Sequence, residues 1–437
     1  MLPLIALNIF VALVFVLAAR KLIVTLYFTV NYIVLINPSV LELVIGATHP
    51  LHRLDPYFYS ETLLFVAAFN VVLGVFFLIF QRALPSFGFF RRMRLNRQLD
   101  QLENSTMVLL ISFAFFAIAI AAKITLDGMG AFRMLEQSST SPALQLIKVF
   151  ASFDRIVLIF LGEYKSRRVN QRNLLNLGFG LIFLVSLIMA IMSGSRSQAV
   201  IVMLIAAIAH RGFLGRHLLT SSVATLAMVP PIFVLFPFLA IFRNSGYRLE
   251  VAVVRLSALW THRDAILLDV LTTRLNYFEP VAHAVEYVRR AGAQGGAIYW
   301  NNFLGIVPRL FWPGKPEIQN NSHVLGHQLG LLSQNDDSTS IGLRVIGEAF
   351  FELGWFGLIV AVFQALLFAA LHKNFGETDG PALATVCIFA AMYLVFADGY
   401  FAIVPGLVLM AIGFVVFFST MSFLLRSNRV QKSFARD

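Results

Sequence analysis

One segment of this chain, residues 242–344, gathers polar side chains that are suited to binding a phosphorylated group. It holds ten of the 34 lysine and arginine residues and four of the nine histidines, in a sequence that is 58% hydrophobic. Arginine, lysine and backbone N–H groups can bind a phosphate group without a metal ion. The segment is therefore predicted to hold the chemistry of this protein and to bind an anion.

Two cations of this segment stand on backbone that proline stiffens. Pro308, Pro313 and Pro316 surround Arg309 and Lys315. An anion that binds cations already held on stiff backbone orders little additional chain, so the entropic cost of binding is small. Arg309 and Lys315 are therefore predicted to bind an anion.

Arg196 lies before that segment, in the turn Ser193–Gln198 between two apolar stretches. The small residues of this turn leave backbone N–H groups open beside the guanidinium group, and the N-terminus of a helix is expected to follow. This is the pattern of an anion-binding nest. The alternative is a loop arginine that contacts lipid headgroups.

Arg344 and Glu348 are one helical turn apart where the chain is expected to re-enter the membrane. An ion pair within the helix is one interpretation. Glu348 is also expected near the interface of an apolar span, where an ionisable side chain is a functional candidate. Both interpretations stay open.

Asp154 and Arg155 lie inside another expected span. Burying either charge alone at the centre of a bilayer costs roughly 2.5–3.5 kcal/mol on insertion scales. A partner within the helix bundle is therefore expected. Lys148 and Arg155 are seven residues apart and share a helix face. One interpretation is that they extend a basic groove into the membrane; the other is that these charges form structural pairs.

His323 and His327 have the spacing of metal ligands on a helix, and Asp336 or Asp337 could complete such a site. No HExxH or comparable motif accompanies them. No metal site and no cofactor is predicted.

The elements that must position these residues are membrane helices. Only 13% of the residues are charged, whereas soluble domains carry about 25%, and apolar runs of about 17–25 residues are long enough to cross a bilayer. The fold class predicted is an all-α polytopic membrane protein of about 11 transmembrane helices. The expected spans are residues 3–19, 22–38, 61–80, 105–123, 146–162, 174–192, 197–214, 218–241, 345–371, 381–397 and 401–425.

The long polar segment is expected to fold partly into helices. Residues 248–287 place apolar side chains at helical spacing, which indicates amphipathic helices at the membrane surface. Gly292–Gly296 then ends the pattern. The predicted organisation is an N-terminal membrane bundle of about eight helices (1–241), one large loop (242–344), and about three C-terminal membrane helices with a basic tail (345–437).

Orientation follows from the lysine and arginine residues of the short connections. Eighteen lie on one side of the membrane and five on the other. The richer side, which holds the C-terminal tail, is predicted to be cytoplasmic, so the large loop is extracytoplasmic. The eighteen are Arg20, Lys21, Arg82, Arg91, Arg92, Arg94, Arg97, Lys165, Arg167, Arg168, Arg172, Arg211, Arg216, Lys373, Arg426, Arg429, Lys432 and Arg436; the five are Arg53, Lys123, Arg133, Lys148 and Arg196.

Composition also limits the classes of partner that this chain is expected to bind. The net charge of +11 favours anionic lipid headgroups or a phosphorylated substrate. Nucleic acid is not expected, because most of the charge lies in loops between spans. The single cysteine excludes an intramolecular disulfide and a cysteine-based metal site.

Two motifs resemble those of one family. SGSRSQAV (Ser193–Val200) resembles the Ser–Arg turn of the O-antigen polymerase and ligase superfamily. IVPRLFWPGKP (Ile306–Pro316), with STS (Ser338–Ser340) and GEAFFELGWFG (Gly347–Gly357), resembles the outer loop and re-entry helix of Wzy-type oligosaccharide repeat-unit polymerases. The similarity covers about residues 190–360.

The resemblance implies a GT-C-like bundle in the bacterial inner membrane with its large loop in the periplasm. It implies metal-independent transfer of a growing glycan from undecaprenyl pyrophosphate to a second lipid-linked repeat unit. A flippase and a chain-length regulator would be partners. The residues expected to bind pyrophosphate or glycan are Arg196, Arg243, Arg248, Arg309, Lys315, His323 and Arg344.

The acceptor hydroxyl of such a transfer needs a general base. Related ligases carry a histidine just before the re-entry helix, whereas this chain has Asp336–Asp337–Ser338–Thr339 there. The candidates are, in order, Asp337, Glu348 and His327.

Two other classes of function are open. A ligase or a single-sugar transferase using a polyprenyl-phosphate sugar is the second. Such transferases usually carry acidic residues in the first outer loop, and the presence of Asp55 alone in that loop counts against this class. The third is a transporter or flippase, which would place charges near the bilayer midplane. Asp154 and Arg155 fit that pattern, but a large outer loop does not.

Overall fold

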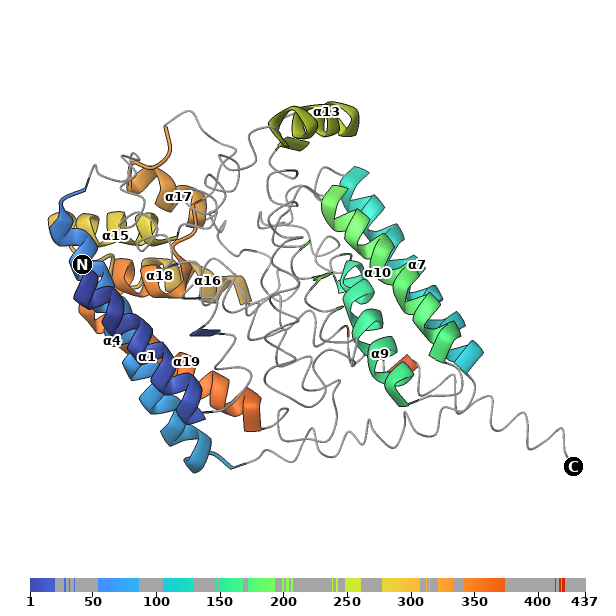
Figure 1. Ribbon diagram of the computed structural model, residues 1–437, viewed down its shortest axis with the longest axis horizontal. Coiled ribbons are helices and arrows are strands. Elements are labelled where there is room, and N and C mark those ends of the chain that lie inside the picture. Colours follow the sequence, from blue (N-terminus) through green and yellow to red (C-terminus); the bar gives the residue numbers. More distant parts are fainter. Residues whose placement is uncertain are drawn as a thin grey trace, which may run out of the picture.

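The computed structural model describes residues 1–19, 54–85, 105–128, 149–167, 172–192, 248–260, 277–306, 321–333 and 341–373, with isolated residues between and after them. These residues form helices and the turns that join them, and they contain no strand (Figure 1). The predicted all-helical class is confirmed for this part of the chain.

Five helical segments in the described residues are long and apolar enough to cross a membrane: Leu2–Ala19, Pro56–Ala83, Ser105–Leu126, Asn173–Met192 and Arg344–Ala370. They coincide with five of the expected spans. The span expected at 146–162 corresponds in part to α9 (Phe153–Arg167). The spans expected at 22–38, 197–214, 218–241, 381–397 and 401–425 lie outside the described residues, apart from isolated positions. The helices indicate a multi-pass membrane protein.

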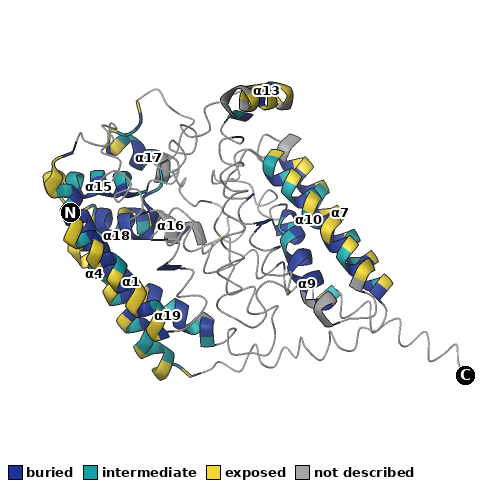
Figure 2. Cartoon of the chain, viewed as in Figure 1, coloured by how far each residue is buried: buried dark blue, intermediate teal, exposed yellow. Residues whose placement is uncertain are grey.

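The first cluster of helices contains α1 (Leu2–Ala19), α4 (Pro56–Ala83) and α19 (Leu358–Leu371), which lie side by side (Figure 1). Their facing sides form a core rich in phenylalanine, and the opposite sides are exposed apolar surface (Figure 2). An exposed apolar face is what a helix in contact with lipid requires, since lipid tails are as apolar as the core.

Specific contacts show that these three helices run in the same direction. The Asn8 side chain donates to the Leu63 carbonyl at 3.0 Å near the start of α1 and α4. The Lys373 ammonium group donates to the Leu84 carbonyl at the other end, where α4 and α19 finish. The alternation of charge between connections predicts this shared direction, because all three spans should run from the outer side inward.

The second cluster contains α7 (Ser105–Gly128), α9 and α10 (Arg172–Met192). Ser105 and Tyr164 share a hydrogen bond of 3.1 Å at one end of α7 and α9, and an ion pair joins the two helices nearer the other end. They are therefore antiparallel. Gly178 of α10 packs against Leu109, so α10 runs with α7. These directions also agree with the predicted topology.

Helices of the large loop cover one end of the first cluster. They are α15 (Phe278–Ala291), α16 (Ala297–Ile306) and α17 (Asn321–Gln328); α13 (Leu249–Trp260) stands apart from them (Figure 1). α15 confirms the predicted amphipathic pattern, because Val281, Ala284 and Val285 are buried. It also ends as predicted, with Gly292 at a φ of 86°.

The segment expected as the span 345–371 is bent in two. α18 (Arg344–Leu353) packs along α15, the short 3₁₀ turn η5 (Gly354–Gly357) changes the direction, and α19 then continues beside α4. Gly354 has φ 58° and ψ −136°, which only glycine adopts readily. The bend places α18 among the loop helices and leaves α19 in the bundle.

Gly357 makes this bend close-packed, which gives a first prediction. A Cβ atom there would lie 2.3 Å from the Ala349 carbonyl oxygen. We expect Gly357→Ala to lower the free energy of unfolding by about 1–3 kcal/mol, as overpacking does, measured by thermal unfolding of the purified protein in detergent. Gly180→Ala is the control, since a Cβ there meets nothing within 4 Å. Equal melting temperatures for the two variants would contradict the close packing.

The packing crosses the predicted boundaries at 241 and 344. α4 from the N-terminal part, α15 from the loop and α19 from the C-terminal part share one core. The division into three parts stays a prediction about how the chain crosses the membrane. Apart from α13, the described helices pack into two clusters, and the first cluster combines all three parts.

Candidate functional site

The candidate site is the polar face of α18. Arg344, Glu348 and Glu352 follow one another at intervals of four residues, so they lie within about 80° of each other around the helix. Their exposed fractions are 6%, 2% and 0%. α18 is buried along its length from Arg344 to Glu352 (Figure 2). Three buried ionisable side chains on one face of a helix are costly in an apolar chain and mark a functional candidate.

Arg344 begins this face and contacts the loop. Its guanidinium carbon lies 3.7 Å from the centroid of the Tyr277 ring, directly before α15. Its φ of 57° is uncommon for a residue other than glycine. Such backbone conformations persist where the surrounding structure holds them. The cation is therefore held in place by both its backbone and an aromatic face.

Glu348 lies one turn further along α18. It is a predicted general base, and the structure places it on the same buried face as Arg344. The two residues are thus one helical turn apart, as predicted, and both are buried. Gly347 beside it packs against Val281 of α15, which keeps the two helices close.

Glu352, at the end of the face, was missed by the sequence analysis. Its carboxylate is buried and accepts no hydrogen bond from the described residues, and the backbone N–H groups of Gly296, Ala297 and Ile298 at the start of α16 are near enough to favour its charged form. The backbone of Glu352 also contacts the loop before α16, because the Gly295 N–H donates to the Glu352 carbonyl at 2.8 Å. The four-residue spacing from Glu348 was a signal that could have identified it.

A second charged group joins three distant parts of the chain, and it too was missed. Glu61 of α4 accepts hydrogen bonds from Arg289 of α15 and from the indole N–H of Trp355 in η5. The hydrogen bonds to Glu61 raise the pKa of the Arg289 guanidinium above its usual value. Glu61 had no signal in the sequence, since it stands alone in an apolar run.

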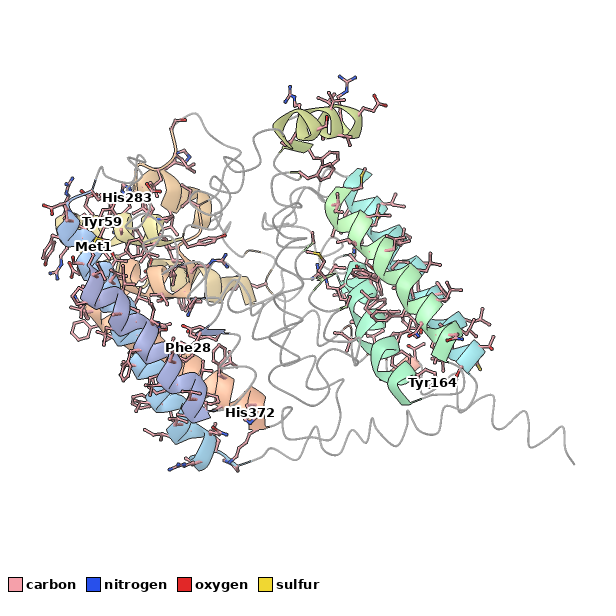
Figure 3. All side chains as sticks on the ribbon, in the orientation of Figure 1. Met1, Phe28, Tyr59, Tyr164, His283 and His372 are labelled. Carbon is pink, nitrogen blue, oxygen red and sulfur yellow. The ribbon has the colours of Figure 1, made fainter. Side chains whose placement is uncertain are left out.

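Two further groups at this end of the cluster have structural roles. Asp55, the acid considered for a single-sugar transferase, caps α4 by accepting the Tyr57 N–H at 2.9 Å. His283 lies 3.7 Å from Glu286, and burial lowers the pKa of the imidazole although that carboxylate partly opposes the shift. His283 therefore adds little positive charge at neutral pH. Tyr59 and His283 mark this end of the cluster, and His372 marks the other (Figure 3).

The other predicted site residues are placed only in part. His327 is partly buried in the last turn of α17, and Arg248 is exposed directly before α13. The side chains of Arg196, Arg243, Arg309, Lys315, His323 and Asp337 lie outside the described residues. The structure brings together Arg344 and Glu348, and the convergence of the remaining residues stays a prediction.

No three potential metal ligands gather within the described part of the chain. The proposed pairing of His323 with His327 lies beyond this observation, because the side chain of His323 is not among the described residues.

The expected partner of Asp154 is Lys123 of α7, which forms a buried ion pair with it. The prediction that this carboxylate has a partner inside the bundle is confirmed. The other carboxylate oxygen, Oδ1, is buried without a hydrogen bond from the described residues. Lys148, which would extend a basic groove from Arg155, lies outside the described part.

The fold and site define a polytopic helical membrane protein with buried charges in both helix clusters. Comparison with family models, with curated proteins and with solved structures finds no match for this chain.

Proposed function

We propose that this protein polymerises lipid-linked oligosaccharide repeat units at the outer face of the bacterial inner membrane. A hydroxyl oxygen of the incoming unit attacks the anomeric carbon of the growing glycan. The bond from that carbon to undecaprenyl pyrophosphate breaks, the lipid pyrophosphate leaves, and a carboxylate or imidazole takes the hydroxyl proton. A membrane protein is suited to this reaction because both substrates are anchored in lipid.

The observation that carries the proposal is the buried face of α18, where a cation and a carboxylate share one turn beside the loop helices. Arg344 supports the negative charge that develops on the leaving group, as fixed guanidinium groups do in metal-independent transfers. Glu348 is the general base in this proposal. Arg196, Arg243, Arg309 and Lys315 complete the pyrophosphate site in this proposal, with Asp337 and His327 as the other candidate bases.

The proposed orientation places the loop helices in the periplasm. Arg82 and Lys373 lie at the opposite end of the first cluster from α15, as one cytoplasmic side rich in cations requires. Two resemblances add support that is independent of the packing: that of Ser193–Val200 to the O-antigen polymerase and ligase superfamily, and that of Gly347–Gly357 to the Wzy-type polymerases.

One observation favours a second candidate, a transporter or flippase of lipid-linked saccharides. The buried pair Lys123–Asp154 lies between two helices of the second cluster. Ionisable residues inside a membrane commonly line substrate or proton paths. The same pair is equally suited to joining α7 to α9, so the polymerase remains the function that we propose.

Arg196→Ala tests the proposed function. We expect long-chain surface polysaccharide to disappear while material capped with a single repeat unit persists, because ligation and export do not require polymerisation. The measurement is a glycan ladder resolved by size on a gel, in a strain whose own gene is deleted.

Arg255→Ala is the matched control, since Arg255 is an exposed loop arginine on α13; its ladder should equal the wild-type ladder. Loss of every capped form in the Arg196 variant would instead indicate ligation or export. An unchanged ladder would remove Arg196 from the site.

A further inference from the structure

We propose that Glu61 is a positioning residue for the glycosyl transfer, fixing the polar face of α18 by joining to the membrane span α4 both the C-terminal end of α18 and the helix α15 that packs along it. The inference rests on the proposed function for its effect on activity. Its structural part is tested separately.

The contacts at Glu61 are directional. Arg289 donates through Nε to both carboxylate oxygens, at 3.0 and 2.9 Å, and through Nη2 to Oε1. The Trp355 indole N–H donates to the same Oε1 at 3.1 Å. The fork of a guanidinium group against a carboxylate sets orientation as well as distance. The side chain of Glu61 is 5% exposed and that of Arg289 is 47% exposed, so the guanidinium group covers the carboxylate from outside.

The tryptophan contact controls the C-terminal end of α18. Trp355 follows that helix immediately, in the turn that changes the direction of the chain. Its ring packs edge-on against Phe65 of α4 at 5.4 Å and against Phe350 of α18 at 6.3 Å between centroids. The hydrogen bond to Glu61 thus fixes the orientation of the indole ring, and the ring holds the end of α18 against α4.

The arginine contact attaches α15, which packs along α18, to α4. Arg289 is near the end of α15, and Phe278 at its start stacks on Tyr59 of α4 at 5.8 Å. α15 is therefore attached to α4 at both ends. Tyr277 precedes it and carries Arg344 on its ring. A shift of α15 would move the cation at the beginning of the polar face.

The partners of Glu61 lie outside its own span. An isolated carboxylate in an apolar helix is costly, and the contacts that offset this cost come from 228 and 294 residues away. The residue is placed where it can align α15 of the loop and the turn η5 with the bundle. We therefore assign it to positioning, since it is on α4 and acts through Arg289 and Trp355.

The structural part is tested by fluorescence of the full-length protein in detergent micelles. In a variant whose Trp260, Trp300 and Trp312 are phenylalanine, Trp355 is the sole emitter. Glu61→Gln should shift its emission maximum, because the negative charge beside the indole N–H is lost together with the ion pair to Arg289 that holds the carboxylate in place. The matched control is Glu286→Gln, which removes the carboxylate that pairs with the adjacent Arg290; it should leave the emission unchanged. Identical spectra for all three proteins would overturn the proposal.

The catalytic part is tested with lipid-linked repeat units and the purified protein. Glu61→Gln, Arg289→Lys and Trp355→Phe should each lower kcat, by about 10²-fold for Glu61→Gln because small misplacements of reacting groups have effects of this size, with KM little changed. Combined changes should be less than additive, since the three residues act as a unit. Glu286→Gln should retain wild-type kcat.

Two results separate failure of this inference from failure of the proposed function. If the Trp355 emission shifts but kcat stays at the wild-type value, Glu61 does not position the site, and the polymerase assignment stands. If the wild-type protein forms no polymer from these substrates, the polymerase assignment fails, and with it the catalytic role of Glu61.

Discussion

Glu348→Gln should lower the rate of polymerisation by about 10²–10⁴-fold, the range that general base catalysis contributes. Glutamine keeps the size of the side chain and can still accept a hydrogen bond, so the buried face of α18 should keep its packing. What is lost is the ability to take a proton from the acceptor hydroxyl. The measurement is kcat with lipid-linked repeat units, together with the length of the glycan ladder in cells.

Glu250→Gln provides the control, because Glu250 is an exposed carboxylate on α13. Its activity should match that of the wild type. A loss of less than about tenfold in Glu348→Gln would be too small for a general base. It would transfer that role to Asp337 or His327, and the pH–rate profiles of Asp337→Asn and His327→Gln would then distinguish these two.

Lys123→Met should destabilise the protein by about 3–5 kcal/mol, the usual effect of leaving one member of a buried ion pair without its partner. The side chain of Asp154 is fully buried, and its Oδ1 atom has no hydrogen bond from the described residues to offset the loss. The variant should show a lower melting temperature in detergent and a reduced yield of folded protein in membranes.

The double variant Lys123→Met, Asp154→Leu separates structure from transport. Replacing both charges with apolar side chains of similar size is often neutral or stabilising. We expect it to recover the melting temperature and the glycan ladder, which is the outcome for a pair that only joins α7 to α9. Recovery of stability without the ladder would favour a role for the pair in moving a substrate or a proton.

Much of the architecture could be read from local patterns. Runs of apolar residues predict the membrane helices because a helix in lipid must satisfy its own backbone hydrogen bonds and present apolar side chains. Heptad-like spacing at Val281, Ala284 and Val285 predicts the buried face of α15. Gly292 marks its end, since glycine adopts a positive φ without steric cost.

The site was predicted only where its residues are neighbours in the sequence. Arg344 and Glu348 are separated by one helical turn, so their common face follows from the geometry of the α-helix. The same argument extends to Glu352. For Asp154, the cost of burying a charge predicted that a partner exists, but not which residue it is.

The amino-acid sequence by itself determined the helical class, the position of five long apolar helices and the directions in which they run. Those properties depend on side-chain spacing and on charge counts within short segments. Only the tertiary structure decided that Lys123 pairs with Asp154, that Gly354 bends the last described span, and that Glu61 meets Arg289 and Trp355. Such pairings depend on how helices pack, and packing joins residues whose separation along the chain leaves no periodic pattern to read.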